Sequence, residues 1–386
     1  MPDCAILYIG TLVKVKGRVM MKKIRVGIIF GGKSAEHEVS LQSAKNIVDA
    51  IDKDKYEVVL IGIDKAGKWH LNETSSYLLN ADNPKLIQLN KSNDHVAIVP
   101  GEADKQLIHT ANAKQLDQLD VVFPIVHGTL GEDGSLQGMM RIANLPFVGP
   151  SVLSSSICMD KDIAKRLLKT AGIRVAEGLT FTRAKKDLVD YDEAVEKLGT
   201  PMFIKPANQG SSVGVSKVST KEEFDKGIEA AFQYDHKVII EETLVGREVE
   251  CSVLGNEDPK ASFPGEILPN TAFYSYESKY IDEKGAELAI PADLSEAETE
   301  HIQQTAIAAF EALQCEGLAR VDFFLTKAGE VYVNEVNTLP GFTKISMYPK
   351  LWEVSGMTYP DLINRLIELA IERHEADDKL KSSVWE

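Results

Sequence analysis

Short apolar runs alternate with amphipathic stretches over the first third of the chain. Residues 24–30 (IRVGIIF), 56–64 (YEVVLIGID) and 120–128 (DVVFPIVHG) are the apolar runs. After the first of them, six apolar residues recur at helical spacing, namely Val39, Leu41, Ala44, Ile47, Val48 and Ile51. Strands that alternate with helices predict a mainly parallel sheet. We therefore assign residues 21–145 to a first α/β domain, within which the polar stretch 72–118 has no readable pattern.

The middle of the chain has the pattern of a smaller α/β unit, which we place at residues 146–245. A helix is predicted at 160–172, where Gly172 is a plausible C-cap, and another at 220–233. Three apolar runs near the second helix predict strands: PMFIKPA (201–207), VGVSKV (213–218) and KVIIEET (237–243).

Residues 246–386 predict a third unit, rich in antiparallel strands. Strand patterns occur at 247–255, 261–268, 317–326 and 331–338, with a long helical pattern between the second and the third. The last helix, at 359–374, places Leu362, Ile363, Leu366, Ile367, Ala370 and Ile371 on one apolar face. The predicted fold class is thus α/β followed by α+β.

Composition narrows the class of protein further. The 386 residues carry a net charge of −15, which disfavours nonspecific binding of nucleic acid. The four cysteines are far apart, so the sequence suggests neither a disulfide framework nor a zinc site. No apolar run approaches the roughly 20 residues of a membrane helix, and we expect a cytoplasmic protein. Residues 1–20 precede the first strand pattern and are expected to be a disordered extension.

Polar residues on the predicted hairpin 320–337 form a candidate metal site. Arg320 and Asp322 alternate with an apolar residue and share one face of their strand. On the second strand, strict alternation places Glu335 and Asn337 on one face and Asn334 on the other. If the strands pair around their turn, Asp322 meets Glu335 and Asn337, an all-oxygen set that suits Mg²⁺ or Mn²⁺ with phosphates. The alternative is a solvated hairpin face.

The stretch KPANQGSSVG (205–214) reverses the order of a Walker loop, because its lysine ends a strand before the glycines. Its small residues predict a turn between two antiparallel strands. Backbone N–H groups and the hydroxyls of Ser211 and Ser212 could then face phosphate oxygens, with Lys205 beneath. A plain glycine turn is the alternative.

Three other stretches are candidates for binding. In VIIEETLVGREVE (238–250), Glu241, Leu244 and Glu248 could line a nucleoside slot, or form an exposed acidic linker. Glu36 in GGKSAEHEVS (31–40) could hold an ammonium group, or only favour a helix start. His127 in HGTLGEDGS (127–135) could be a binding or a turn residue. The aperiodic 274–287 could be a lid or a surface loop.

The chain contains two further motifs, MDK at 159–161 and NEVNTLPGFT at 334–343. Together with the stretches above, and in this order, they resemble the D-alanine–D-alanine ligases of the ATP-grasp superfamily, most closely the enterobacterial type. The resemblance runs from about Met21 past His374. It implies an ATP-grasp fold, in which an N-terminal parallel-sheet domain precedes two subdomains that hold ATP between them. One departure is Gln209, where relatives often carry an acid.

The resemblance also implies a role for each residue. Lys161 and Lys205 would contact ATP phosphates, with Ser212 and Asn334 beside them. The adenosine slot would be lined by Glu241, Leu244 and Glu248. Two Mg²⁺ or Mn²⁺ ions would be held by Asp322, Glu335 and Asn337. Glu36, Ser211 and Tyr280 would form a hydrogen-bonded trio, and Arg320 with the Gly341 N–H would stabilise the oxyanion. Glu36 and His127 would serve the first D-alanine, and Lys279 and Ser346 the carboxylate of the second.

The implied reaction joins two D-alanines at the expense of ATP, through a D-alanyl phosphate, for peptidoglycan precursor synthesis. A homodimer is expected from the family. Alternative activities are D-alanine–D-lactate ligation, a glutathione-synthetase-like reaction, or nucleotide binding without catalysis.

Overall fold

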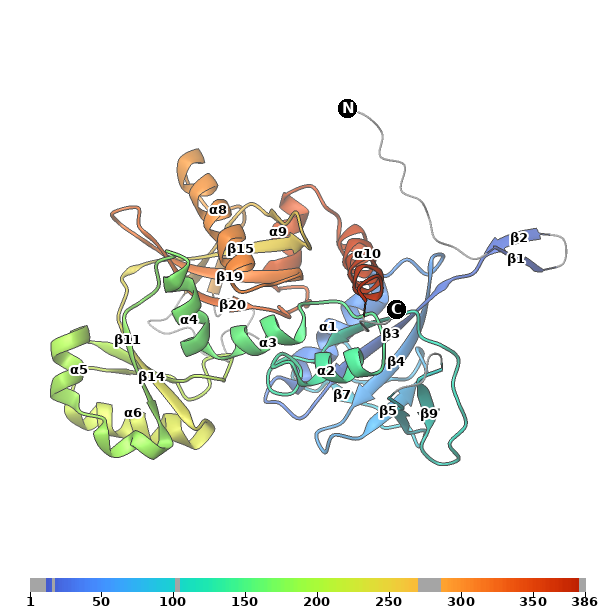
Figure 1. Cartoon of the computed structure of the whole chain (residues 1–386), viewed down its shortest axis with the longest axis horizontal. Helices are drawn as coiled ribbons and strands as arrows, with labels where there is room; N and C mark the ends of the chain where they lie inside the picture. Colours follow the sequence, from blue (N-terminus) through green and yellow to red (C-terminus); the bar gives the residue numbers. More distant parts are fainter. Residues whose placement is uncertain (1–11, 16–17, 101–104, 270–285, 382–386) are drawn as a thin grey trace.

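The computed structural model describes the chain except for residues 1–11, 16–17, 101–104, 270–285 and 382–386. Strands β1 (Leu12–Val15) and β2 (Arg18–Met21) pair as an antiparallel hairpin that projects from the first domain (Figure 1). The disordered extension expected at residues 1–20 differs from this hairpin in the part of the segment that the structure describes.

The first domain is built on a sheet in the order β10-β3-β4-β5. Its strands are β3 (Ile24–Gly31), β4 (Tyr56–Ile63), β5 (Trp69–Asn72) and β10 (Val121–Ile125). The first two and β10 run parallel, and only the edge strand β5 is antiparallel, which confirms the predicted sheet.

Helices cover both faces of this sheet, so its inner strands read as continuous apolar runs. On one face, α1 (His37–Ala50) packs Leu41 and Ile47 against Ile28 of β3. On the other, α2 (Ser135–Ile142) packs Leu136 and Met140 against Ile29.

The stretch 72–118, in which the sequence shows no clear pattern, contains two small hairpins. They are formed by β6 (Leu78–Leu79) with β7 (Gln88–Leu89), and by β8 (Val96–Ile98) with β9 (Leu107–His109). Strands of two or three residues are too short to show a hydrophobic period, which is why the sequence did not predict them.

The central unit is an antiparallel sheet in the order β11-β14-β12-β13. Its elements are β11 (Gly178–Thr182), the 3₁₀ helix η1 (Arg183–Leu188), α5 (Tyr191–Leu198), β12 (Met202–Pro206), β13 (Ser216–Val218), α6 (Lys221–Tyr234) and β14 (Lys237–Glu242). A capping box between Thr220 and Glu223 begins α6, whose Phe224 and Ile228 pack on the sheet. Because β12 and β13 pair antiparallel, the glycine-rich stretch is the connection between two paired strands, as predicted.

The third unit is an antiparallel sheet covered by one long helix, α8 (Glu296–Ala312). Its strands are β15 (Gly246–Gly255), β16 (Lys260–Ala261), β17 (Gly265–Pro269), β18 (Ala286–Ala289), β19 (Gly317–Thr326) and β20 (Val331–Asn337). The single strand predicted at 261–268 is instead split between β16 and β17. Pro264 lies at the break and has no N–H to donate to a ladder.

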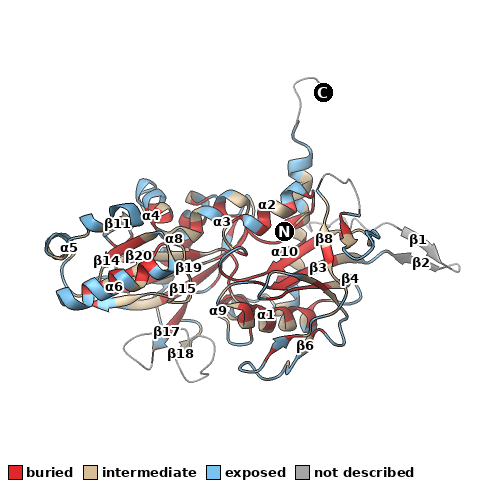
Figure 2. Cartoon of the chain, turned by 90° about the horizontal axis from the view of Figure 1, so that it is seen from below, coloured by how far each residue is buried: buried red, intermediate tan, exposed pale blue. Residues whose placement is uncertain are grey.

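The remaining helices connect the units. Helices α3 (Val152–Met159) and α4 (Lys161–Thr170) pack on the third unit, where Leu168 joins the core of Phe310 and Val321. Helices α9 (Met347–Val354) and α10 (Tyr359–Asp378) lie between the first domain and the third unit. Tyr348 and Leu362 join the core of the first domain, while α9 also packs on β15 and α10 on β19. Figure 2 shows the strands largely buried, while α5 and α6 of the central unit have an exposed face.

Candidate active site

The N-terminal domain meets the glycine-rich loop through one polar contact. Glu36 directly precedes α1, and the hydroxyl of Ser211, 175 residues away, donates a hydrogen bond to its Oε1. Ser211 and Ser212 have φ of 52° and 60°, in the left-handed region, so the loop turns sharply here. Two members of the predicted trio therefore lie together. The third, Tyr280, and the predicted substrate residue Lys279 lie outside the described residues.

Lys161 links the same loop to the third unit. It is the first residue of α4, whose N-cap is Asp160. Its Nζ donates to the carbonyl of Gln209 at 2.8 Å and lies 3.4 Å from Oε2 of Glu335. The predicted phosphate-binding lysine thus lies between the loop and the predicted metal site.

A buried chain of three charges lies behind the loop. Lys205 Nζ is 2.7 Å from Oε2 of Glu241, and Lys165 Nζ binds Oε1 of the same carboxylate. Sequence reasoning missed Lys165, although it follows Lys161 by four residues and so shares its helical face. Burial lowers the pKa of Lys165 to about 8 against the attraction of Glu241. Burial also disfavours the charge on Glu241, but the two lysines outweigh it and lower the pKa of the carboxyl to about 2.

The hairpin β19–β20 brings the predicted metal-binding residues together. Asp322 lies opposite Glu335, and Arg320 lies opposite Asn337, which confirms the predicted pairing. Arg320 donates two hydrogen bonds to Asp322, at 2.7 and 2.8 Å, and the Asn337 amide donates to Asp322 at 3.0 Å. Glu250, on the neighbouring strand β15, lies 2.9 Å from Arg320 Nε and was not predicted.

A β-bulge corrects the predicted placement of Asn334. The register shifts between Asp322 and Phe323, so that β20 contains one extra residue. On either side of Asn334 and Glu335, the flanking Val333 and Val336 are both buried. Strict alternation would have placed these two valines on opposite faces, whereas the bulge leaves Asn334 and Glu335 both half-buried between them. Strict alternation predicted that Asn334 and Glu335 lie on opposite faces of the strand. The bulge makes this prediction wrong.

The chemistry of these donors fits a hard divalent cation. Asp322 and Glu335 supply carboxylate oxygens and Asn337 an amide oxygen, the ligand types that Mg²⁺ and Mn²⁺ prefer beside phosphates. Within the described part of the chain, no group of three or more His, Cys, Asp and Glu side chains could hold a metal ion. A metal site here therefore depends on the amide and on oxygens of a bound nucleotide.

The helix α9 begins at a second cluster of predicted residues. Ser346 is its N-cap, and Ser346 Oγ accepts a hydrogen bond from Thr343 N–H at 2.9 Å. A Cβ atom on Gly341 would come within 2.7 Å of the same Oγ, so a larger residue there would displace the hydroxyl of Ser346. A helix N-terminus of this kind favours a carboxylate or an oxyanion.

His127 supports this cluster from the first domain. It is buried, and its Nδ1 lies 3.0 Å from the carbonyl oxygen of Leu339. Its Nε2 lies 3.1 Å from Ser43 Oγ, which accepts the N–H of Phe342 at 3.1 Å. Burial lowers the pKa of His127, which keeps the ring neutral at pH 7. With both ring nitrogens on protein groups, His127 positions the segment that contains Gly341.

Glu132 is a further residue that sequence reasoning missed. It lies in the same glycine-rich stretch as His127 and accepts the N–H of Gly128 at 2.7 Å. Burial and the nearby Glu36 raise the pKa of Glu132 to about 8, so one proton is held by this carboxyl near pH 7. Its position in HGTLGEDGS is the signal that could have drawn attention to it.

Leu244 lies in the connection between β14 and β15, and Glu248 lies near the start of β15. Leu244 is half-buried in the connection, and Glu248 is half-buried opposite Phe324 and Ile267 of the adjacent strands. This position between the two subdomain sheets is compatible with the predicted nucleoside slot.

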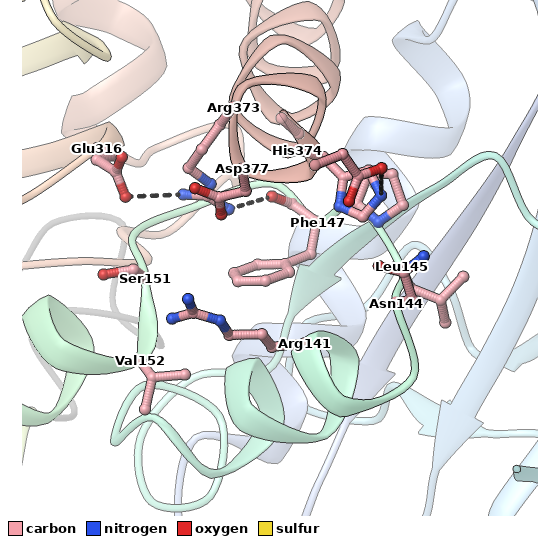
Figure 3. A pocket seen from close by; sticks show the side chains of 13 residues that line it. Arg141, Asn144, Leu145, Phe147, Ser151, Val152, Glu316, Arg373, His374 and Asp377 are labelled. Carbon is pink, nitrogen blue, oxygen red and sulfur yellow. Dashed lines mark hydrogen bonds and ion pairs between the residues drawn. The ribbon is translucent and has the colours of Figure 1, made fainter. Parts of the chain in front are cut away.

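A separate cavity of about 360 Å³ lies between α2, α10 and Glu316 and contains none of the predicted residues. Figure 3 shows Arg373 lying between Glu316 and the backbone of Phe147. Arg373 donates to the carbonyls of Phe147 at 2.8 Å and of Gly149 at 2.5 Å. We therefore interpret this region as the junction between the first domain and the third unit.

Among the residues that the structure describes, no helix has both the length and the apolar character needed to cross a membrane.

Comparisons with known proteins agree with this geometry. Residues 25–150 match the family model described as D-ala D-ala ligase N-terminus, and residues 167–368 match the one described as D-ala D-ala ligase C-terminus. The chain is 70% identical to the D-alanine–D-alanine ligase of Shouchella clausii over 95% of this chain and 100% of that one. It is 58% identical to D-alanine–D-alanine ligase A of Escherichia coli K12 over 94% of this chain and 100% of that one.

A solved structure is similar over almost the same length. The D-alanine–D-alanine ligase of Coxiella burnetii superposes with a TM-score of 0.80 at 41% identity, covering 92% of this chain and 96% of that one. The predicted relation to the enterobacterial type is confirmed by the Escherichia coli protein, although identity to the Shouchella protein is higher.

Proposed function

The chain belongs to the D-alanine–D-alanine ligase family, and on that premise we propose that it joins two D-alanine molecules at the expense of ATP. The dipeptide, ADP and phosphate are the products. The observation that carries this proposal is the meeting of three units at one place. Ser211 contacts Glu36, and Lys161 contacts both the glycine-rich loop and Glu335.

In the first step, the carboxylate of one D-alanine attacks the γ-phosphorus of ATP, and the bond from this phosphorus to the β–γ bridging oxygen breaks as ADP leaves. Glu36 holds the ammonium group of this D-alanine, and Lys161 and Lys205 neutralise the phosphate charge. The product is D-alanyl phosphate, whose phosphate is a good leaving group. Positioning and electrostatic stabilisation supply most of the rate in such a transfer.

In the second step, the deprotonated amine of the other D-alanine attacks the acyl carbonyl. Arg320 and the Gly341 N–H stabilise the oxyanion that forms, and Ser346 at the start of α9 orients the carboxylate of the attacking molecule. The tetrahedral intermediate then expels phosphate and leaves the dipeptide.

Divalent cations complete the site. Asp322, Glu335 and Asn337 would hold two Mg²⁺ or Mn²⁺ ions, which when bound neutralise the charge of the transferring phosphoryl group. The chain itself contributes Arg320, which shares Asp322 with this site and so links it to the oxyanion site.

The product is a building block of peptidoglycan precursors, and we propose that the protein works as a homodimer in the cytoplasm.

The test is phosphate release by the purified protein from ATP and Mg²⁺, with and without D-alanine, with products identified by mass spectrometry. We expect release that depends on D-alanine, and D-Ala-D-Ala as the product. Release with γ-glutamylcysteine and glycine but not with D-alanine would indicate a glutathione-synthetase-like enzyme. A dominant ester product when D-lactate competes would indicate a depsipeptide ligase, and nucleotide binding without release would indicate a regulatory protein.

A further inference from the structure

We propose that Lys165 is a positioning residue that holds Glu241, so that Lys205 remains available to the phosphates of ATP. This inference rests on the proposed function, because it assigns Lys205 to the nucleotide. It concerns a lysine that shares the inner face of α4 with Lys161 but binds a carboxylate of the protein.

The geometry places one carboxylate between two cations. Glu241 presents Oε1 to Lys165 and Oε2 to Lys205, the latter at 2.7 Å. The side chains of these two lysines and the glutamate are only 9%, 12% and 6% exposed, respectively. They come from α4, β12 and β14, so that the backbone of three elements holds the arrangement in place.

The charges explain why two lysines are needed. A buried carboxylate without a partner is costly, and it attracts the nearest cation strongly because little water screens it. Lys165 neutralises Glu241 through Oε1, while Lys205 binds Oε2 of the same carboxylate. The cluster then retains a net charge of one positive unit, which Lys205 can direct to a polyphosphate. Without Lys165, Glu241 would compete with the nucleotide for Lys205.

If Lys165 contacted a phosphate directly, its loss would also weaken nucleotide binding. The test must therefore separate a role through Glu241 from a direct contact with the nucleotide. Removing the carboxylate as well as Lys165 does so. If Lys165 acts through Glu241, its loss no longer matters once Glu241 is replaced by the neutral and similarly shaped glutamine. If Lys165 binds phosphate itself, its loss still weakens binding.

The experiment is isothermal titration of the full-length protein with ADP and with a non-hydrolysable ATP analogue, both with Mg²⁺. We expect Lys165→Met to weaken binding about tenfold, which corresponds to about 1.4 kcal/mol, because Glu241 would then compete with the nucleotide for Lys205. We expect the double variant Lys165→Met/Glu241→Gln to bind within about twofold of Glu241→Gln alone. Lys169→Met is the matched control, because Lys169 lies on the same helix in an exposed pair with Glu177 and should bind like wild type.

Unchanged affinity in a folded Lys165→Met protein would overturn the inference, and so would a double variant much weaker than Glu241→Gln. If Lys165→Met alone fails to fold, the comparison of Glu241→Gln with the double variant still decides, because neither contains an uncompensated carboxylate. Failure of the wild type to bind either nucleotide would instead contradict the proposed function.

Discussion

Glu335 is the residue at which the metal assignment can be tested most directly. It is half-buried, lies opposite Asp322 and contacts Lys161 at 3.4 Å. We expect Glu335→Ala to reduce turnover by about 100-fold or more, because the divalent cations would lose a carboxylate ligand. Its melting temperature should change little, because no core side chain is removed.

The measurement is D-alanine-dependent phosphate release, with circular dichroism to follow melting. Glu330→Ala is the control, since Glu330 lies on the same hairpin in an exposed pair with Arg174. Near-normal turnover by a folded Glu335→Ala protein would show that Glu335 is not a metal ligand.

The ionisation of Lys165 predicts how nucleotide affinity depends on pH. Its pKa is lowered to about 8, so the side chain is protonated below pH 8 and neutral well above it. When it is neutral, Glu241 depends on Lys205 alone, and Lys205 stays charged because Glu241 raises its pKa against the effect of burial. We therefore expect ADP affinity to fall as pH rises from 7 to 9.

This profile is measured by titration calorimetry at each pH, with Lys165→Met as the comparison. The variant has no proton to lose at this position and should show a flatter profile over the same range. Parallel profiles for the two proteins would assign the pH effect to another group.

At the scale of elements, two glycines have different effects on the stability of their helices. Gly172 follows α4 with φ of +79°, and the N–H of Ile173 bonds to Leu168 O, as expected for a helix that ends in a left-handed residue. A Cβ atom at Gly172 would meet nothing within 4 Å, so only the backbone conformation disfavours a side chain there. Gly138 lies inside α2, and a Cβ atom there would make an ordinary contact at 4.0 Å with Val152.

We therefore expect opposite effects on stability. Gly172→Ala should destabilise the protein by about 1–2 kcal/mol, the cost of a left-handed non-glycine residue. Gly138→Ala should stabilise it by about 0.5–1 kcal/mol, because alanine loses less backbone entropy in a helix. Urea unfolding followed by circular dichroism measures both, and shifts of the same sign would contradict this account of the two positions.

At the scale of the whole molecule, α10 ties the first domain to the third unit. Arg373 donates to two carbonyls of the connecting segment, and its guanidinium lies 4.5 Å from the centre of the Phe147 ring. It also lies 3.6 Å from Glu316, just before β19. This side chain of the last helix therefore contacts both the segment between the domains and the third unit.

We expect Arg373→Met to lower the melting temperature, by a loss of about 2–4 kcal/mol, because it removes charged hydrogen bonds to buried carbonyls. Methionine retains much of the apolar stem, so packing is largely kept. Arg365→Met is the matched control on the same helix, where an exposed pair with Glu372 should contribute well under about 1 kcal/mol. Equal melting temperatures for the two variants would show that this junction adds nothing to stability.

The sequence by itself determined the class of fold and most of its elements. Buried strands and amphipathic helices leave apolar periods of two and 3.6 residues, and these are local properties that the chain order displays. The hairpin at 320–337 was predictable for the same reason, since a turn joins two adjacent strands and sets their pairing. The order of motifs was enough to predict the family to which the chain belongs.

Only the tertiary structure decided which distant side chains meet. Ser211 and Glu36 are 175 residues apart, and Lys165 and Glu241 are 76 apart, so no local period relates them. The bulge at Asn334 was equally hidden, because one extra residue in a strand reverses every side chain beyond it without changing the apolar composition. Contact depends on how separate elements pack together, whereas periodicity reports only which face of each element is buried.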